Sequence, residues 1–379
     1  MTDLLAELEA ATNHSGQDAL LLFTTNPGLE DVVAAEFRQL LQAEHLPGPD
    51  IDLRPFGFGG HVLVRVVPPT TPGDGWRLAS RMRSIHHVVR PLYSFQFEPG
   101  ADAPLAAVAS TILERGIPDM EEAASFRITS RRTGDHPFSK IDVQREAGAA
   151  LVTRYGTPVD LFDFDLNVRV DVYGGRCNVG IQLTRTLLSQ RFTRLYNPRA
   201  TLRSNVAYAL LHLAGIDQQT ENQPPVRLLD PFCGSGTILF EASRLAADLE
   251  VVGSDLSAEA VDGARRNMAV AGLADRIPIG CEDALAIGTT YAGRGIDAIV
   301  TNPPYGVRLG RTLNFFDFYS KFLEQSAQLL EPGDRLAFIC WKRGVVDRVN
   351  QRSGQFTKLH SRVVETGGIY PRIYIMKRR

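Results

Sequence analysis

The sequence predicts an α/β protein whose C-terminal part is a doubly wound parallel sheet and whose N-terminal part is an α+β arrangement. Three observations lead to this prediction. Short apolar strands alternate with helices from residue 226 onward, an order typical of a parallel sheet covered on both faces. Before residue 190, strands and helices come in mixed order and end in a hairpin across Gly174-Gly175. The 379 residues are 44% hydrophobic and 22% charged, which suits two or three globular domains.

In the N-terminal part, hydrophobic periodicity and turn residues define the elements in order. A strand at 19–24 passes through Asn26-Pro-Gly28 into a helix at 29–41, and a second strand follows at 61–67. Residues 68–75, rich in proline and glycine, form the exit from this β-α-β unit. We then expect helices at 78–89, 105–115 and 140–155, strands at 92–97, 125–130, 167–173 and 177–183, and a loop at 131–136.

In the C-terminal part, each strand is short and apolar and most are followed by a helix. A helix at 201–214 and a short linker at 222–225 come before the sheet. Ligands of such a sheet bind beyond the carboxyl ends of its strands. The expected strands are 226–229, 250–253, 277–279, 298–301 and 335–340, the helices are 237–249, 258–271 and 315–329, and the last strands lie within 354–365 and 369–376.

Charge and cysteine usage exclude several classes of protein. No run of ~18 apolar residues is present, and the first residues are acidic and polar, so we expect neither a membrane span nor a secretory signal. Four cysteines lie far apart without metal-ligand spacing, so we expect no metal site, no disulfide scaffold and a reducing, cytoplasmic compartment. The net charge is −2, yet residues 172–216 hold six arginines and no acid, and residues 341–379 hold ten Lys or Arg against two acids. Such basic blocks suit a phosphate backbone about as well as a solvated surface.

The first strand of the C-terminal sheet runs into Asp230-Pro-Phe-Cys-Gly234-Ser-Gly236-Thr237. Glycines at a strand-to-helix turn allow a ligand close to the backbone, and the helix start offers free N–H groups. Leu239 stands where a dinucleotide motif would carry its third glycine. Asp255 ends the second strand, where it can accept hydrogen bonds from a ribose diol, although a helix N-cap is the alternative use. Asp283 ends the third strand, where an adenine would lie.

The fourth strand ends in Asn302-Pro303-Pro304-Tyr305. An amino group on a base is a weak nucleophile because its lone pair delocalises into the ring. The Asn302 amide oxygen and the Pro303 carbonyl can accept its two protons and so turn the nitrogen toward an electrophilic methyl group. Tyr305 offers a face on which a flipped base can stack. Catalysis would then consist of positioning and electrostatic support rather than strong acid–base chemistry.

These two motifs together resemble the S-adenosylmethionine-dependent amino-methyltransferases. The N-terminal half narrows the resemblance: Pro27-Gly-Leu-Glu-Asp31 is similar to the ferredoxin-like module of THUMP-containing RNA methyltransferases, and residues 126–139, 159–161 and 180–191 resemble the THUMP domain. The ending, residues 363–372, looks most like the tRNA guanine-N2 methyltransferases that modify the acceptor-stem guanine at position six.

The resemblance implies four segments: a ferredoxin-like module (1–70), a THUMP RNA-binding domain (71–190), a linker with a helix over the cofactor site (191–225) and a Rossmann-like methyltransferase domain (226–379). It implies a cytoplasmic monomer that binds S-adenosylmethionine and methylates tRNA, with RNA contacts at Arg131, Arg132, Arg191, Arg308 and Arg372. Asn302, Pro303, Pro304 and Tyr305 are the expected catalytic residues. The expected cofactor-binding residues are Ala200, Leu202, Asp230, Phe232, Gly234, Gly236, Thr237, Asp255, Leu256, Asp283, Ala284 and Asn302.

Other functions remain open at this point. The first alternative is a guanine-N2 methyltransferase acting on ribosomal RNA, although such relatives usually extend further at the C-terminus. The second is a non-catalytic THUMP RNA-binding protein with a vestigial cofactor site, which the presence of Asp230, Asp255, Asp283 and Asn302 disfavours. The RNA-binding half disfavours a protein-glutamine methyltransferase. Cys233 lies in the cofactor turn, so we assign it no role as a nucleophile toward a pyrimidine.

Overall fold

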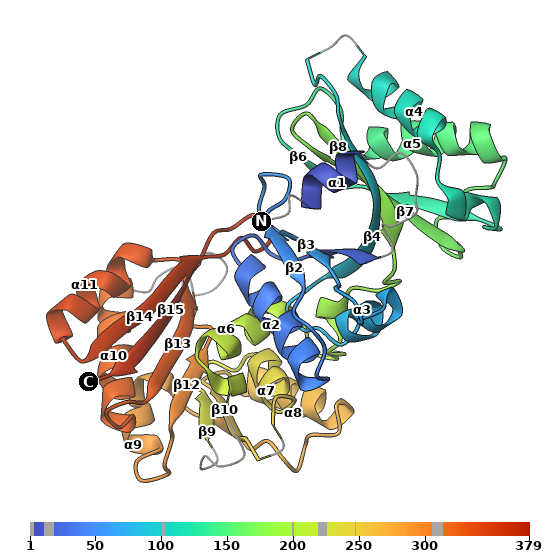
Figure 1. Ribbon diagram of the computed structural model, residues 1–379. Helices are drawn as coiled ribbons and strands as arrows, with labels where there is room; N and C mark the ends of the chain where they lie inside the picture. Colours follow the sequence, from blue (N-terminus) through green and yellow to red (C-terminus); the bar gives the residue numbers. More distant parts are fainter. Residues whose placement is uncertain are drawn as a thin grey trace. The chain divides into compact units, whose positions relative to one another are not determined.

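The computed structural model describes residues 4–10, 19–100, 103–198, 201–218, 226–246, 248–304 and 314–379. The chain divides into two compact units, Met1–Leu188 and Ser189–Arg379, and each is built around its own β-sheet (Figure 1). We describe the units separately.

In the first unit, one long strand joins the two halves of the sheet. Strand β4 (His87–Gln96) pairs antiparallel with β1 (Leu20–Thr24) on one side and with β8 (Arg176–Gln182) on the other. The sheet therefore continues across the module boundary expected near residue 70. Its order is β2-β3-β1-β4-β8-β7-β5, with β2 at Asp50–Leu53, β3 at His61–Arg65, β7 at Leu166–Tyr173 and β5 at Phe126–Thr129, and the two-residue strand β6 (Arg132–Thr133) pairs with β7.

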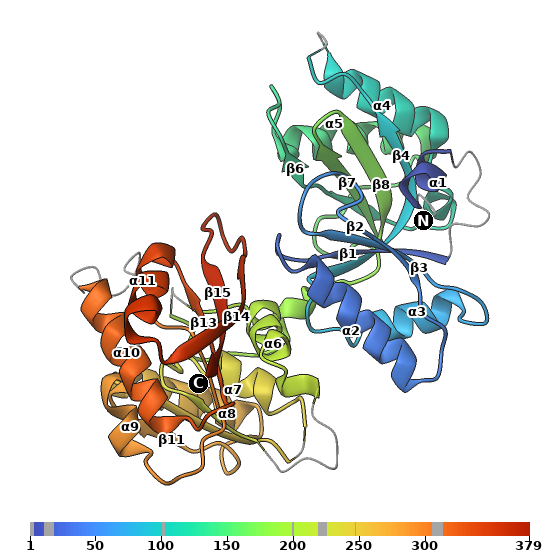
Figure 2. The same cartoon turned by 60° about the vertical axis from the view of Figure 1, so that its left-hand side comes forward.

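Helices at the two ends of this sheet enclose separate hydrophobic cores (Figure 2). Helices α2 (Glu30–Ala43) and α3 (Pro72–Ala79) pack at one end, around Phe23, Phe37 and Val64. Helices α4 (Pro104–Arg115) and α5 (Lys140–Tyr155) pack at the other end, around Phe126 and Val170. The short α1 (Leu4–Ala10), which the sequence pattern did not reveal, buries Leu4 and Leu8 in a third cluster with strand residues.

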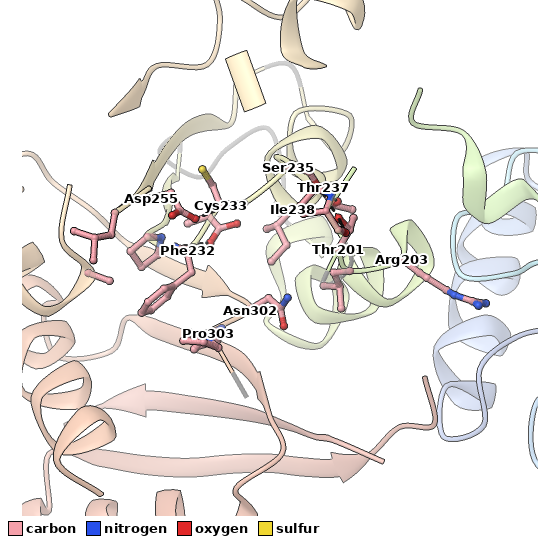
Figure 3. Close-up of a pocket in the computed structure, with 18 of the residues that line it drawn as sticks. Thr201, Arg203, Phe232, Cys233, Ser235, Thr237, Ile238, Asp255, Asn302 and Pro303 are labelled. Atoms are coloured by element: carbon pink, nitrogen blue, oxygen red, sulfur yellow. Dashed lines mark hydrogen bonds between the residues drawn. The ribbon is translucent and has the colours of Figure 1, made fainter. Parts of the chain in front are cut away.

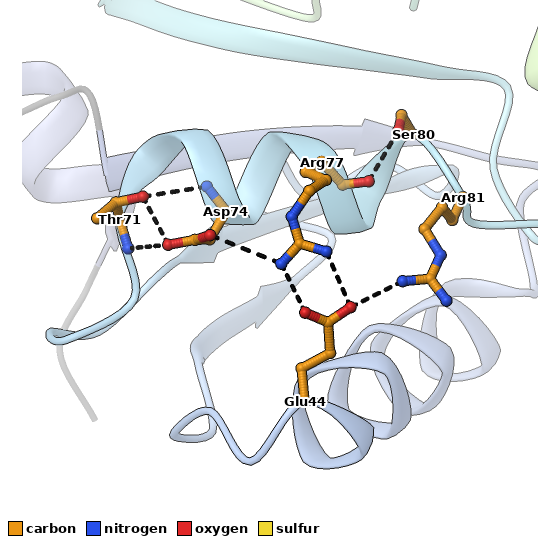
Figure 4. Close-up of polar contacts among 6 residues, drawn as sticks. All are labelled: Glu44, Thr71, Asp74, Arg77, Ser80 and Arg81. Carbon is orange, nitrogen blue, oxygen red and sulfur yellow. Dashed lines mark hydrogen bonds and ion pairs between the residues drawn. The ribbon is translucent and has the colours of Figure 1, made fainter.

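The expected helix at 78–89 is wrong. The helix is α3, eight residues long and ending at Ala79, and Val88 and Val89 belong to strand β4. The signal was present in the segment interpreted as an exit turn. Thr71 caps the helix by accepting from the Asp74 N–H at 3.1 Å, the Asp74 carboxylate accepts from the Thr71 N–H in return, and Pro72 occupies the first turn (Figure 4). Arg77 then pairs with Glu44 of the segment after α2 through two hydrogen bonds, of 2.9 and 2.6 Å.

The second unit contains a seven-stranded sheet of order β11-β10-β9-β12-β13-β15-β14. Strands β11 (Ile279–Cys281), β10 (Glu250–Asp255), β9 (Arg227–Asp230), β12 (Ala298–Thr301) and β13 (Arg335–Cys340) run parallel. The last two strands complete the sheet: β15 (Arg372–Arg378) inserts antiparallel between β13 and β14 (Phe356–Val363), so β14 runs in the same direction as β13.

Helices flank this sheet in the doubly wound manner (Figure 2). Helices α9 (Ile287–Thr290), α10 (Phe315–Leu329) and α11 (Arg343–Ser353) share a core with β9, β12 and β13. Helices α6 (Ser204–Leu213), α7 (Thr237–Ala242) and α8 (Ala258–Val270) complete the unit. Helix α7 ends at Ala242 rather than at the expected Leu249, and the expected linker 222–225 lies outside the described residues. Among the helices that the structure describes, none has both the length and the apolar composition to cross a membrane.

The capping box predicts a measurable contribution to stability. Replacing Thr71 with Ala leaves the N–H of Asp74 without its side-chain acceptor, so the free energy of unfolding should fall by about 1 kcal/mol. Urea unfolding followed by circular dichroism measures the change. Thr111→Ala is the matched control, because Thr111 lies inside α4 and its hydroxyl donates to the Ala107 carbonyl instead of capping a helix. Equal losses of stability in the two variants would contradict the capping role.

Candidate functional site

A cavity of about 540 Å³ opens at the carboxyl edge of the parallel strands in the second unit (Figure 3). Its walls come from the turn after β9, the ends of β10, β11 and β12, the segment before α6, and the tip of the β14–β15 hairpin. Most residues predicted for the cofactor site line it: Leu202, Asp230, Phe232, Gly234, Thr237, Asp255, Leu256, Asp283, Ala284 and Asn302, together with Pro303 and Pro304. Ala200, Tyr305 and Arg308 lie outside the described residues.

The turn between β9 and α7 requires its two glycines. Gly234 and Gly236 have φ values of 53° and 84°, in the left-handed region that side chains disfavour. Gly236 caps α7 rather than lining the cavity, and a Cβ there would stand 2.8 Å from the Met268 side chain. Leu239, at the position of the missing third glycine, packs against Gly253 of β10, where a Cβ would stand 2.5 Å from Leu239. The close helix–strand approach is thus achieved with a glycine on the strand.

Asp230 is the buried acid at the base of the cavity, with 1% of its surface exposed. Its Oδ1 accepts a hydrogen bond of 2.6 Å from the Thr301 hydroxyl of β12 and one of 3.2 Å from the Phe232 N–H. Burial raises the pKa of Asp230 to about 7, although both hydrogen bonds oppose the rise. The side chain can therefore exchange a proton near neutral pH.

Asp255 joins the end of β10 to the glycine turn. Its Oδ2 accepts from the Gly234 N–H and its Oδ1 from the Ser257 N–H, each at 3.0 Å. Ser257, and not Asp255, caps helix α8 by accepting from the Ala260 N–H. The carboxylate is partly exposed and lines the cavity, so an acceptor that a ligand can reach stands beside the turn.

The neighbouring wall is mainly apolar. Asp283 follows β11 and accepts from the Leu285 N–H at 2.8 Å, which fixes the short turn that holds Ala284. Leu256, 70% exposed, and Leu285 complete this wall. A planar apolar group with polar edges fits between such side chains and the Asp283 carboxylate.

Asn302 and Pro303 follow directly after strand β12 and lie next to Phe232 of the glycine turn (Figure 3). β12 lies beside β9, so its end places an amide at the same edge of the sheet as Asp230. The arrangement brings an amide, carboxylates and a glycine turn to a single cavity, as the sequence motifs predicted.

The segment 191–198, which leads to the cavity, is anchored by buried polar contacts that sequence reasoning missed. Arg191 pairs at 2.7 Å with Glu241, whose side chain is fully buried in α7. The Asn267 amide of α8 accepts from the N–H groups of Leu195 and Tyr196 and donates to the carbonyls of Tyr196 and Ser235. One side chain thus fixes both this segment and the glycine turn. The available signal was a polar residue within an apolar helix pattern, at Glu241 and at Asn267.

The β14–β15 hairpin contributes a wall that was not among the predicted site residues. Gly367 and Gly368 have φ values of 61° and 81°, as a tight two-residue turn requires, and Thr366 and Ile369 pair across it. Thr366, Gly367 and Ile369 line the cavity. The Gly-Gly pair between two strands was the available sequence signal.

The predicted RNA-binding arginines have different environments. Arg132 lies in β6 rather than in a loop, and its guanidinium donates to the Gly134 carbonyl. The N–H of Arg131 donates to Asp171. Arg372 begins β15 and donates to Ser361. Arg191 is held by Glu241, so its guanidinium has a structural use in the second unit. Their contact with RNA stays a prediction.

The raised pKa of Asp230 predicts a pH-dependent stability. The folded state holds this proton up to about pH 7, whereas the unfolded carboxyl ionises near its ordinary value of 3.8. Stability from this group should therefore fall as pH rises between those values and stay at the lower level above them. Asp230→Asn keeps an acceptor for Thr301 and removes the titration. The unfolding free energy of this variant, relative to that of the wild type, should therefore rise from pH 4.5 to pH ~7. Urea unfolding across that range measures the difference, and a difference independent of pH would contradict the assignment.

Comparisons with known proteins agree with this site. A family model for the RMKL-like methyltransferase domain matches residues 191–372, and a THUMP-domain model matches residues 105–182. A tRNA (guanine(6)-N2)-methyltransferase of Thermus thermophilus is 36% identical over 360 residues, which cover 94% of this chain and 98% of the relative. An enzyme of the same name from Archaeoglobus fulgidus is 29% identical and covers 66% of this chain, with 69% of its own length matched.

A solved structure extends the likeness to three dimensions. The crystal structure of TrmN from Thermus thermophilus superimposes with a TM-score of 0.72 at 34% identity, and the match covers 95% of this chain and 99% of TrmN. The predicted family and fold class are confirmed by these matches. Because a relative at 36% identity is matched over nearly its whole length, this chain belongs to the THUMP-containing methyltransferase family of the tRNA (guanine(6)-N2)-methyltransferases.

Proposed function

We propose that the protein transfers a methyl group from S-adenosylmethionine to the exocyclic N2 of guanosine 6 in the tRNA acceptor stem, giving N2-methylguanosine. The observation that carries the proposal is the single cavity in which Asp255 and Asp283 meet Asn302 and Pro303. The relatives named tRNA (guanine(6)-N2)-methyltransferase supply the acceptor and its position.

The residues of the cavity fit the proposed cofactor. Asp255 keeps a partly exposed carboxylate that can accept both hydroxyl hydrogens of a ribose. Leu256, Ala284 and Leu285 form an apolar wall for an adenine, with the Asp283 carboxylate at its edge. The glycine turn lets the remaining part of the cofactor approach the backbone at the start of α7. When bound, S-adenosylmethionine supplies the electrophilic methyl group.

Asn302 and the backbone that follows it bind the methyl acceptor, the guanine amino group. Guanine N2 is a poor nucleophile, because its lone pair is shared with the ring. A hydrogen bond from the amino group to the Asn302 amide oxygen orients that nitrogen and stabilises the positive charge that develops on it during transfer. The base must leave its stem to enter the cavity, and Tyr305 is the proposed stacking partner.

The cellular setting is also proposed. Three of the four thiols are buried and none is bonded to another, which fits a reducing compartment such as the cytoplasm.

We propose a monomer in which the four expected segments are retained. Residues 1–70 and 71–190 form the RNA-binding part, and residues 191–225 connect it to residues 226–379.

Nucleoside mass spectrometry tests the function directly. Purified tRNA and ribosomal RNA from cells with and without the protein are digested and compared. Loss of N2-methylguanosine from tRNA alone is the expected result. Loss from ribosomal RNA alone would assign the ribosomal alternative, and unchanged profiles in both RNAs would contradict a methyltransferase acting on guanosine N2.

The role of Asp255 predicts a loss of cofactor affinity. Hydrogen bonds to a charged acceptor contribute ~1.5–3 kcal/mol, so Asp255→Ala should weaken binding roughly ten- to a hundred-fold. Calorimetric titration with S-adenosylhomocysteine measures this. Asp262→Ala, an exposed acid on α8 outside the cavity, is the matched control and should bind normally. Unchanged affinity in Asp255→Ala would remove this residue from the site.

The role of Asn302 predicts a loss of turnover instead. Asn302→Ala removes an acceptor that acts mainly in the transition state, so single-turnover methyl transfer at saturating cofactor should drop on the order of a hundred-fold or more. Affinity for S-adenosylhomocysteine should stay close to normal. Asn350→Ala is the control, since Asn350 bonds α11 to the Phe356 carbonyl away from the cavity. A wild-type rate in Asn302→Ala would show the mechanism to be wrong.

A further inference from the structure

We propose that Arg127 and Arg185 of the first unit form a binding site for backbone phosphates of the RNA substrate. Strand β5 buries Phe126 and Ile128 in the core with α4 and α5, so Arg127 extends from the opposite face of the sheet. The proposal rests on the proposed function, because that function supplies an RNA substrate.

The two guanidinium groups are held around one aromatic ring. The Arg127 Cζ lies 3.9 Å from the centroid of the Phe164 ring and the Arg185 Cζ lies 5.3 Å from it. Each side chain also donates to a backbone carbonyl of the same loop, Arg127 to Leu161 at 3.5 Å and Arg185 to Phe164 at 2.7 Å. The loop therefore fixes two positive charges close together before any ligand arrives.

This pair of charges lacks a carboxylate. Within the described residues neither arginine forms an ion pair, whereas Arg169 on the neighbouring strand is neutralised by Asp171 at 2.8 Å. Asp160 and Asp165 of the adjoining loop accept backbone N–H groups instead. Burial and the charge of Arg185 lower the pKa of Arg127, which agrees with an uncompensated positive potential.

Unused donors add to the pair. Arg127 Nε is buried and has no acceptor within the described part of the chain. Asn167 stands beside Arg127 in the β5–β7 register and is 3% exposed. Its Oδ1 accepts from Thr129, but its Nδ2 likewise has no acceptor there. Two positive charges beside two donors that have no acceptor favour an anion as the ligand.

Phosphate on RNA is the anion that the surroundings favour. A guanidinium fork matches the oxygens of a phosphate, and two forks fixed at one ring suit a repeating chain of phosphates. Phe162 in the adjoining loop is 92% exposed, which leaves an aromatic ring free to contact a sugar or an unpaired base next to the phosphates. A protein carboxylate is the competing ligand, and the test distinguishes it.

Salt-dependent binding of an unmodified tRNA transcript tests the site. Each lost phosphate contact lowers the slope of log affinity against log salt by about 0.7–0.9, so Arg127→Gln/Arg185→Gln should lower it by about 1.4–1.8. Affinity at low salt should drop roughly ten-fold or more. Arg127→Lys/Arg185→Lys keeps both charges and should recover most of the slope, which a purely structural role would not produce. Arg145→Gln is the control, because Arg145 is already paired with Asp142 and Glu146 on α5.

Circular dichroism melting tests whether each variant is folded. If the Gln variant is unfolded, the slope of the Lys variant tests the proposal. An unchanged slope in a folded Gln variant, or binding of a poly-glutamate peptide that depends on both arginines while tRNA binding does not, would overturn the proposal. Wild-type formation of N2-methylguanosine is measured in parallel. If the wild-type protein forms no N2-methylguanosine, the proposed function is contradicted, and the phosphate site is still tested by the salt slopes.

Discussion

The hydrogen bond from Thr301 to Asp230 joins β12 to β9, the two neighbouring strands at which the strand order of the second unit reverses direction. Strands β9 and β12 pair only at Ala298 with Leu228 and Ile299 with Leu229, so their carboxyl ends separate beyond that point. The chain continues to β10 on one side of β9 and to β12 on the other, which makes a crevice at the strand ends unavoidable. A bond of 2.6 Å closes the floor of this crevice and partly offsets the effect of burial, which raises the pKa of the Asp230 carboxyl to about 7.

Hydrogen bonds connect part of the crevice lining to that floor. The glycine turn rises from Asp230, and Asp255 holds it through the Gly234 N–H. Asn267 then ties the carbonyl of Ser235 to the segment that continues to Thr201 and Leu202. These contacts are made by single side chains with few substitutes. Asn267 of α8 therefore contacts both the glycine turn and the segment that leads to the cavity.

In the first unit, basic side chains lie on or beside strands of which the central ones, β7 and β8, are almost wholly buried. Some of these charges pair with acids inside the fold, and others form no ion pair within the described residues. Arg169 is committed to Asp171, and in the second unit Arg191 is committed to Glu241. Arg127 and Arg185 instead use an aromatic ring and two carbonyls. A basic block in the sequence therefore mixes structural cations with cations that are available to a ligand.

The sequence alone determined the order of the strands in the second unit, most of its helices and the motifs at the strand ends, because those signals are local. Helices α9 and α11 were not predicted. A glycine turn after a strand, acids at strand ends and an Asn-Pro-Pro turn reveal their geometry within a few residues. Helix α5 agreed with its expected bounds, since Ser139, Asp142 and Gly156 mark both ends. The capping signal of α3 was equally local, but the Pro/Gly-rich composition of residues 68–75 concealed it.

Only the tertiary structure decided the contacts between residues far apart in the chain. The antiparallel insertion of β15 pairs residues up to 42 positions apart (Arg335 with Lys377), and the clamp at Asn267 joins residues 72 positions apart, for which no local pattern exists. The place of the hairpin tip, Thr366 to Ile369, in the cavity wall likewise has no local signal. The same holds for the use of each arginine. Residue type gives the charge, but the nearest carboxylate, ring or carbonyl is fixed only when the strands pair.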